Sequence, residues 1–233
     1  MVLVAARNPL NIGAAARAMS NFGFSRLRVV NPYDLAFREA RSAVGAADVL
    51  ANAEEFKTIA DAVADCSLVI GTTGAPDRSL QQPLYRLEEA AQRLRPQLTS
   101  APVALLFGSE KVGLSRSELG HCHWLLRIPT REEHLSMNLG QAVAVCLYEL
   151  VRDAKPMTAE AAVRAPSGDV ERITALLMDV LRASGYVKPR TQVSTEEKVR
   201  CLVRRLYIAP ADAEVLLGML RQIGWKLKTD ITE

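Results

Sequence analysis

The sequence predicts an α/β fold with a mostly parallel sheet, followed by a small helical domain. Apolar runs of four or five residues recur along the first half, and each is bounded by Gly, Pro, Asn or Ser. These strand-like runs cover residues 2–5, 27–30, 67–71, 103–107 and 125–128. Helical patterns lie between them, at residues 12–22, 55–65, 85–94 and 139–152. Such alternation indicates parallel strands with helices on both faces of the sheet.

The first helix carries its own start and stop signals. Ile12, Ala15 and Met19 share one face, and Gly23 stands where a C-terminal cap belongs. Asn11 is a candidate N-cap for this helix.

The helix expected at 139–152 has Asn138 as a candidate N-cap. Its apolar stripe consists of Leu139, Val143, Cys146, Leu147 and Leu150. Such a stripe, with Tyr148 beside it, is equally compatible with a buried core and with a subunit interface.

The pattern changes after Arg152. Residues 155–156 and 165–168 contain Pro and Gly in a stretch of low hydrophobicity, which is typical of a linker. Three amphipathic stripes follow, at 170–181, 199–206 and 213–223. We therefore expect a domain at 1–152, a linker at 153–168 and a helical domain at 169–233. These helices could share a core, or could pack on the first domain or on a second subunit.

Composition excludes several classes of protein. Of the 233 residues, 49% are hydrophobic and 24% are charged, which is not typical of a disordered chain. Aromatic residues make up only 5%, so a stacking platform for single-stranded bases is not expected to dominate. The four cysteines form no CxxC pair, which excludes a disulfide scaffold and a zinc ribbon. No apolar run approaches the roughly 20 residues of a membrane span, and no signal-peptide pattern is present; we expect a cytoplasmic protein.

The net charge of +3 is mild and unevenly placed. Residues 185–233 contain nine Lys or Arg against six Asp or Glu, so the excess lies near the C-terminus. This suits contact with a polyanion, and it is also typical of a solvated basic helix face.

Standard nucleotide and metal signatures are missing. No GxGxxG follows a strand, and neither a Walker A sequence nor HExxH occurs. His121, Cys122 and His123 are adjacent, and neighbouring residues on a strand point to opposite faces, so they cannot share one ion. His134 stands alone in a predicted loop. We expect no metal site.

Polar or glycine-bearing loops follow four of the predicted strands, at residues 7–18, 71–74, 105–115 and 126–142. In the first, Gly13 and Arg17 are four apart and share a helix face, which leaves room for an anion or a ribose beneath the guanidinium. In the third, Gly108 allows close backbone approach and Glu110 follows just past the strand end. Ligands of open α/β sheets bind at such strand ends.

Three of these segments carry ordered motifs. They read NxGxxxR at 11–17, FGSExxGLS at 107–115 and IPxxxxxxSMNLGQAVAVxLYE at 128–149. Together they resemble the motifs of the TrmH-type branch of the SPOUT RNA methyltransferases, over residues 2 to about 152. The resemblance implies a sheet whose C-terminal segment forms a trefoil knot, an arrangement that is rare among folds.

The resemblance also implies a cofactor and a reaction. Family members bind S-adenosylmethionine, bent, in the knot loops, and transfer its methyl group to a ribose 2′-oxygen. The matching cofactor residues here are Thr72, Thr73, Gly74, Gly108, Ile128, Leu135, Ser136 and Met137. The motif arginine is Arg17, which we expect to orient the hydroxyl and the adjacent phosphate. Asn11, Glu110 and Asn138 would shape the pocket.

The family works as homodimers, with the arginine of one subunit near the cofactor of the other. The helical tail resembles that of a family member that methylates nucleotide 32 in the tRNA anticodon loop, which makes tRNA the expected partner. The tail cations expected on its backbone are Lys188, Arg190, Lys198, Arg200, Arg204 and Arg205. The alternatives are a ribosomal RNA methyltransferase, a non-catalytic RNA-binding SPOUT protein and a generic doubly wound nucleotide-binding enzyme.

Overall fold

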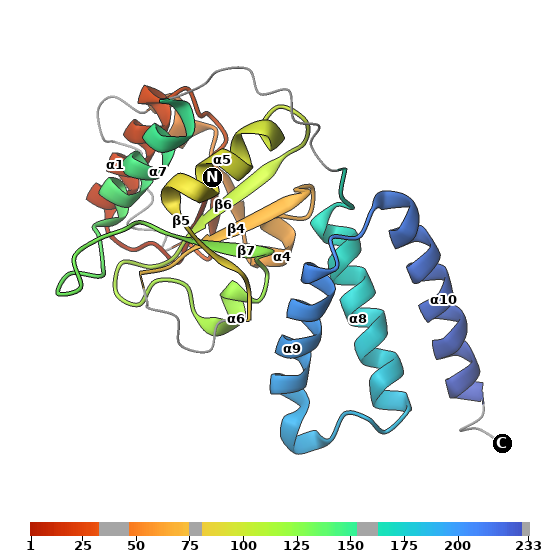
Figure 1. Cartoon of the computed structure of the whole chain (residues 1–233). Helices are drawn as coiled ribbons and strands as arrows, with labels where there is room; N and C mark the ends of the chain where they lie inside the picture. The colour runs from red at the N-terminus through yellow and green to blue at the C-terminus, as the bar shows by residue number, and fades with distance from the viewer. Residues whose placement is uncertain (33–46, 75–80, 153–162, 230–233) are drawn as a thin grey trace.

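The computed structural model describes residues 1–32, 47–74, 81–152 and 163–229, and a parallel sheet forms its centre (Figure 1). The strands follow the order β3-β2-β1-β6-β4-β7-β5, and every pairing is parallel. Their bounds are Val2–Val4 (β1), Arg28–Val30 (β2), Glu54–Phe56 (β3), Leu68–Thr72 (β4), Leu84–Arg86 (β5), Val103–Phe107 (β6) and Trp124–Arg127 (β7). The predicted α/β class is confirmed.

Helices cover both faces of this sheet. Those of the first half are α1 (Pro9–Asn21), α3 (Ala47–Ala51), α4 (Ile59–Ala62), α5 (Leu87–Leu94), α6 (Arg116–Leu119) and α7 (Leu139–Val151). On β1, Leu3 belongs to the core beneath α1, α5 and α7, whereas Val2 and Val4 belong to the core beneath α4 and α6. Burial on both faces explains why the sequences of the central strands are continuous apolar runs.

Helix α1 begins one turn earlier than the sequence suggests. Its N-cap is Asn8, whose side chain accepts a hydrogen bond from the Leu10 amide at 2.9 Å, and Pro9 occupies the first helical position. The prediction that Asn11 caps this helix is therefore wrong. The expected stop is confirmed, because Gly23 adopts a φ of +77° directly after the helix.

Two edge strands stand where the sequence pattern indicated helix. Residues 55–65 divide into β3, a short connection and the four-residue α4, and β5 precedes α5 at the start of the stretch 85–94. Both strands lie at the ends of the sheet order. Glu54 and Glu55 are exposed, so β3 lacks the apolar run that marks the central strands.

The apolar stripe of α7 is core. All five of its residues are buried against the sheet and α1. The opposite, outer face of the α1–α7 pair presents Leu10 and Arg17 from α1, and Val145 and Tyr148 from α7, all exposed. These apolar side chains are spread along the outer face, from Leu10 at the start of α1 to Tyr148 beside Phe22 at its end.

The second half forms a layer of three helices, α8 (Ser167–Ala183), α9 (Gln192–Arg205) and α10 (Pro210–Thr229), in which α9 and α10 flank α8 (Figure 1). Val170, Ile173, Val203 and Leu217 are among the residues of its shared core. The predicted stripes are confirmed only in part, because Leu202, Leu206 and Ile223 are exposed. Most of the expected linker, at 153–162, lies outside the described residues.

The helical layer is joined to the sheet domain at a polar junction. The amides of Ser167 and Gly168 donate to the carbonyls of Cys66 and Ala64, at 2.8 and 2.9 Å. Tyr207 contacts the His123 ring at a centroid distance of 5.9 Å, and the Arg164 guanidinium lies 4.9 Å from the Tyr207 ring centroid. These contacts fix where the helices begin relative to the sheet.

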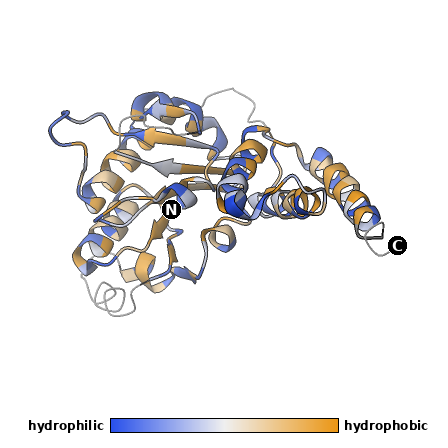
Figure 2. Ribbon diagram, turned by 90° about the horizontal axis from the view of Figure 1, so that it is seen from below, coloured by the Kyte–Doolittle hydropathy of each residue, from blue (hydrophilic) through white to orange (hydrophobic). Residues whose placement is uncertain are grey.

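One loop, residues 129–134, projects from the sheet domain and is strongly hydrophilic (Figure 2). Across the described ranges, no helix combines the length and the apolarity that crossing a bilayer requires. The trefoil knot that the resemblance implies stays a prediction.

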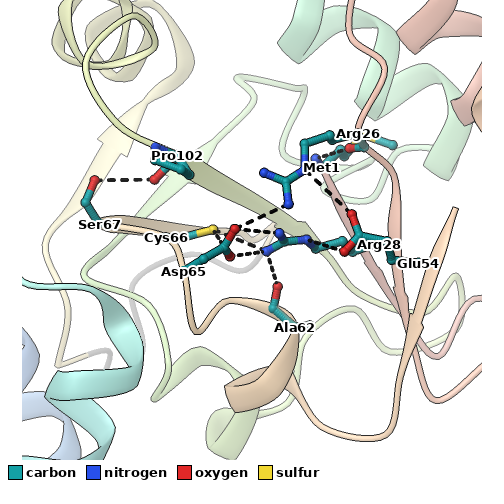
Figure 3. A network of polar contacts seen from close by, with 9 residues as sticks. All are labelled: Met1, Arg26, Arg28, Glu54, Ala62, Asp65, Cys66, Ser67 and Pro102. Atoms are coloured by element: carbon teal, nitrogen blue, oxygen red, sulfur yellow. Dashed lines mark hydrogen bonds and ion pairs between the residues drawn. The ribbon is translucent and has the colours of Figure 1, made fainter. Parts of the chain in front are cut away.

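A buried arginine ties the amino ends of three strand regions together (Figure 3). Arg28 on β2 donates to both carboxylate oxygens of Asp65, at 2.5 and 2.7 Å, and to the Ala62 carbonyl at 2.6 Å. Glu54 of β3 lies 3.8 Å from the same guanidinium. The hydrogen bonds from Arg28 hold the pKa of Asp65 far below its usual range, although partial burial opposes the shift.

We expect Asp65→Asn to lower the free energy of unfolding at pH 7 by about 2 kcal/mol. This loss of stability is smaller than that for breaking a fully buried ion pair, because the Asp65 side chain is 45% exposed. Since folding depresses the pKa of Asp65, the carboxylate stabilises the fold above its ordinary pKa of about 4 and loses this effect as the pH falls. The deficit should therefore shrink between pH 6 and pH 3, as measured by urea unfolding. Glu89→Gln, which breaks an exposed pair with Arg93, should cost under about 0.5 kcal/mol; a deficit for Asp65→Asn that does not vary with pH would contradict the assignment.

Candidate active site

The loops that follow β1, β4, β6 and β7 lie at one edge of the sheet, because these strands are parallel neighbours. A cavity of about 410 Å³ opens there. This volume lies within the range of small-molecule sites, which runs from about 300 to 1,000 Å³.

All eight residues predicted to bind a cofactor line this one cavity. They come from the loop after β4 (Thr72, Thr73, Gly74), the end of β6 (Gly108) and the segment after β7 (Ile128, Leu135, Ser136, Met137). Glu110 also lines it. The sequence placed these residues on separate loops, and the structure brings them together.

Two glycines let the walls of the cavity approach closely. A Cβ on Gly108 would lie 2.1 Å from the carbonyl carbon of Gly113 and 2.2 Å from the Leu114 nitrogen. A Cβ on Gly74 would lie 2.4 Å from the Leu135 carbonyl oxygen. No side chain fits at either position without moving backbone, so these loops can hold their present shape only with glycine there.

A chain of hydrogen bonds connects the three motifs. Asn138, the N-cap of α7, donates from Nδ2 to Oδ1 of Asn11 at 2.8 Å, and Asn11 donates in turn to Glu110 at 3.2 Å. Glu110 also accepts from the backbone amides of Arg7 and Asn8, at 3.2 and 3.1 Å. The expected cap on α7 is confirmed, with Asn138 Oδ1 accepting from the Gln141 amide.

The hydrogen bonds to Glu110 keep it ionised. Partial burial alone would raise its pKa, but the backbone amides and the Asn11 side chain together lower it below the usual value. At neutral pH the cavity wall therefore carries a fixed negative charge.

Three predicted residues do not line the cavity. Asn11 and Asn138 act on it through Glu110, as positioning residues. Arg17 is exposed on the outer face of α1, and within the described part of the chain it has no hydrogen bond or ion pair. The expected catalytic guanidinium therefore lies outside the cavity of its own chain.

Phe107 and Gly113, which belong to the second motif, also line the cavity. Sequence reasoning missed several further lining residues, which are Ser109, Lys111, Val112, Leu114, Leu119, Leu126, Thr130, Leu139 and Ala142. Position within the motifs could have signalled most of them, since the loop 109–114 lies between Gly108 and the α6 N-cap Ser115. The residues of this loop from Ser109 to Gly113 also border a second, more open cavity of about 870 Å³ that includes Arg7 and Asn8.

Two of the three histidines, His121 and His123, are packed inside the protein. His123 Nδ1 accepts a hydrogen bond from the Val69 amide at 3.1 Å, and burial lowers the pKa of this ring to about 3. Burial also lowers the pKa of His121 to about 4, against the opposing effect of Glu171. Among the residues that the structure describes, no three His, Cys, Asp or Glu side chains gather as metal ligands would.

The basic tail divides into inward and outward cations. Arg200 and Arg204 turn inward to Glu171, at 3.1 and 3.3 Å, and Arg204 is only 1% exposed. Arg205 donates to the Gln81 carbonyl of the sheet domain. The expectation that Arg200 and Arg204 grip an RNA backbone is therefore wrong, whereas Lys188, Arg190 and Lys198 are exposed.

Comparisons with known proteins agree with this architecture. The model of the SpoU rRNA Methylase family matches residues 1–148. The tRNA (cytidine/uridine-2′-O-)-methyltransferase TrmJ of Cronobacter sakazakii is 36% identical, over 96% of this chain and 94% of that protein. The crystal structure of TrmJ from Z. mobilis ZM4 superposes with a TM-score of 0.83 at 32% identity, over 95% of this chain and 97% of that one. An AdoMet-bound rRNA methyltransferase from Sinorhizobium meliloti gives a TM-score of 0.51 at 25% identity, over 66% and 56% of the two chains. This chain belongs to the SpoU methylase family.

Proposed function

We propose that this protein is an S-adenosylmethionine-dependent tRNA 2′-O-ribose methyltransferase that acts on cytidine or uridine at nucleotide 32 of the anticodon loop. The observation that carries the proposal is the cavity in which all eight expected cofactor residues meet. The TrmJ relatives, which align over nearly their whole length, support tRNA as the substrate. Nucleotide 32 rests on the resemblance of the helical tail. The expected location is the cytoplasm, with tRNA.

The cavity suits the cofactor chemically. S-adenosylmethionine supplies a methyl group that is reactive because the sulfur that carries it is positively charged. Phe107, Leu126, Ile128 and Leu135 offer apolar surface to a flat adenine ring, and the exposed backbone near Gly108 offers donors and acceptors. Glu110 and Lys111 both line the wall, so a carboxylate and an ammonium group are available to the charged groups of the cofactor.

Arg17 would steer the acceptor. A ribose hydroxyl is a weak nucleophile, so alignment and removal of its proton are the remaining tasks. A guanidinium stays protonated at neutral pH, and it can bind a hydroxyl and the neighbouring phosphate at once. Arg17 thus orients the 2′-hydroxyl, and the phosphate that it holds can accept the proton.

A second copy of the chain would complete the site. Arg17 does not line the cavity of its own subunit, but it lies on the outer face of the α1–α7 pair with Leu10, Val145 and Tyr148. Burial of that apolar surface in a homodimer would bring Arg17 into the interface. We therefore place the guanidinium of one subunit at the cavity of the other. The division into domains at 1–152 and 169–233 belongs to the same proposal, with the tail binding RNA.

The reaction is tested by transfer of radiolabelled methyl groups from S-adenosylmethionine to total tRNA and to ribosomal RNA. The labelled sites are then mapped as alkali-resistant linkages, which form where the ribose 2′-oxygen is methylated. We expect label in tRNA, at pyrimidine 32. Label only in ribosomal RNA would reject the substrate, and label on bases would reject the reaction.

We expect Gly108→Ala to weaken S-adenosylmethionine binding by at least about tenfold, because the new methyl group collides with backbone at Gly113 and Leu114. Titration calorimetry measures the affinity, and circular dichroism confirms that the variant is folded. Gly218→Ala in α10 is the matched control, since a Cβ there meets nothing within 4 Å. If Gly108→Ala binds S-adenosylmethionine with unchanged affinity, this cavity is not the cofactor site.

Arg17→Ala should lower kcat by about a thousandfold, equivalent to roughly 4 kcal/mol of barrier, and should leave cofactor affinity nearly intact. Arg17→Lys keeps the charge but loses the planar fork, so its kcat should also stay well below that of the wild type. Multiple-turnover methyl transfer, with saturating tRNA and S-adenosylmethionine, measures kcat for both variants. Full turnover by Arg17→Ala would show that the guanidinium has no part in the reaction.

A further inference from the structure

The connection between α8 and α9 lies at the end of the helical layer that points away from the sheet (Figure 1). We call residues 184–191 the α8–α9 tip. The tip contains Lys188 and Arg190 and no acidic residue. Its charge is thus purely positive in a layer that otherwise mixes both signs.

The cations of the tip differ from four arginines elsewhere in the layer. Arg172, Arg182, Arg200 and Arg204 are each paired with a carboxylate of the layer itself. Lys188 and Arg190 are exposed and, among the described residues, neither has a hydrogen bond or ion pair from its side chain. Charges that no internal carboxylate neutralises remain available to an external anion.

An aromatic side chain accompanies these charges. Tyr186 is 69% exposed, although tyrosine usually buries much of its ring. The next residue, Val187, packs against the core of the layer instead. Tyr186 therefore points outward from a backbone that is anchored on both sides of it.

The backbone of the tip is held in place. Gly185 adopts a φ of +76° at the end of α8, and the Tyr186 amide donates to the Leu181 carbonyl at 3.1 Å. The Thr191 amide donates to the Lys188 carbonyl at 3.0 Å, which closes the turn before α9. An ordered backbone presents Tyr186, Lys188 and Arg190 with little further entropy to lose on binding.

We propose that the α8–α9 tip binds unpaired RNA, with Tyr186 stacking on a base and Lys188 and Arg190 contacting the flanking phosphates. An exposed aromatic ring followed closely by two cations matches the chemistry of single-stranded nucleic acid, in which every base offers a flat face and every linkage a negative charge. A paired stem offers only its backbone, because its bases are already stacked. The inference rests on the proposed function and identifies the loop of the substrate as the part that the tip recognises.

The test is equilibrium binding of the full-length protein to an unmodified tRNA transcript and to a fully paired RNA duplex, over a range of salt. Tyr186→Ala should raise the Kd for the tRNA about tenfold and leave the duplex unaffected, whereas Tyr186→Phe should stay within about twofold of the wild type. The double variant Lys188→Ala/Arg190→Ala should weaken the binding of both RNAs. It should also reduce the slope of log K against log salt concentration by about 1.5. Arg172→Ala, which removes a paired cation of the same layer, should change neither.

Wild-type methyl transfer to the same transcript separates the two proposals. If the wild type methylates the tRNA and Tyr186→Ala binds it normally, the tip proposal is wrong and the proposed function stands. If the wild type transfers no methyl group to tRNA, the proposed function is wrong. Equal weakening by Arg172→Ala would show that overall charge, and not the tip, governs binding, and would also overturn the inference.

Discussion

The carboxylate of Glu110 is the contact on which the rest of the site depends. It accepts hydrogen bonds from the backbone amides of Arg7 and Asn8, between β1 and α1, and from the side-chain amide of Asn11 in α1; Asn11 in turn accepts a hydrogen bond from Asn138. Bonds to an ionised acceptor are the stronger kind, and together they fix three loops that are far apart in the sequence. Without these hydrogen bonds, the loops that form the cavity walls at Gly108 and Gly74 would not be held in fixed positions relative to one another.

The parallel topology explains why one carboxylate can do this. Strands β1, β6, β4 and β7 are successive neighbours, so their carboxyl ends lie at one edge and their loops converge. The sequence allowed the central strands to be predicted because burial on both faces makes them apolar throughout. It also indicated α1 and α7, whose buried stripes recur at helical spacing. The cavity residues could be predicted from motifs because each motif lies directly after a strand.

The errors have physical causes. The edge strands β3 and β5 are buried on few sides, so their sequences lack an apolar run, and helical spacing in the next residues masked them. Asn8 and Asn11 are both acceptable caps, and only the position of Pro9 decides between them. The sequence suggested that Arg200 and Arg204 are surface charges, because their partner, Glu171, lies about thirty residues earlier, on α8. No local pattern reveals an ion pair of that kind.

That pairing joins α8 to α9 within the helical layer, next to the sheet domain. Glu171 faces Arg200, Arg204 and His121 at the junction, where burial keeps the pKa of His121 low and the ring neutral. A fixed junction would hold the RNA-binding surface at a set distance from the cavity, as the choice of one nucleotide in a large substrate requires. We propose that the reaction needs two subunits, with the cavity from one and Arg17 from the other.

Mixing Arg17→Ala with Gly108→Ala, at a concentration of S-adenosylmethionine too low to fill the weakened cavity, tests this two-subunit arrangement most directly. Arg17→Ala retains the cavity and Gly108→Ala retains the guanidinium, so a dimer with one subunit of each has one complete site if the two come from different subunits. After denaturation and joint refolding, random pairing should restore about a quarter of the wild-type methyl transfer to tRNA, because half of the dimers then hold one of two sites intact. Methyl transfer that stays at the level of the separate variants, in a mixture shown to contain mixed dimers, would contradict the account.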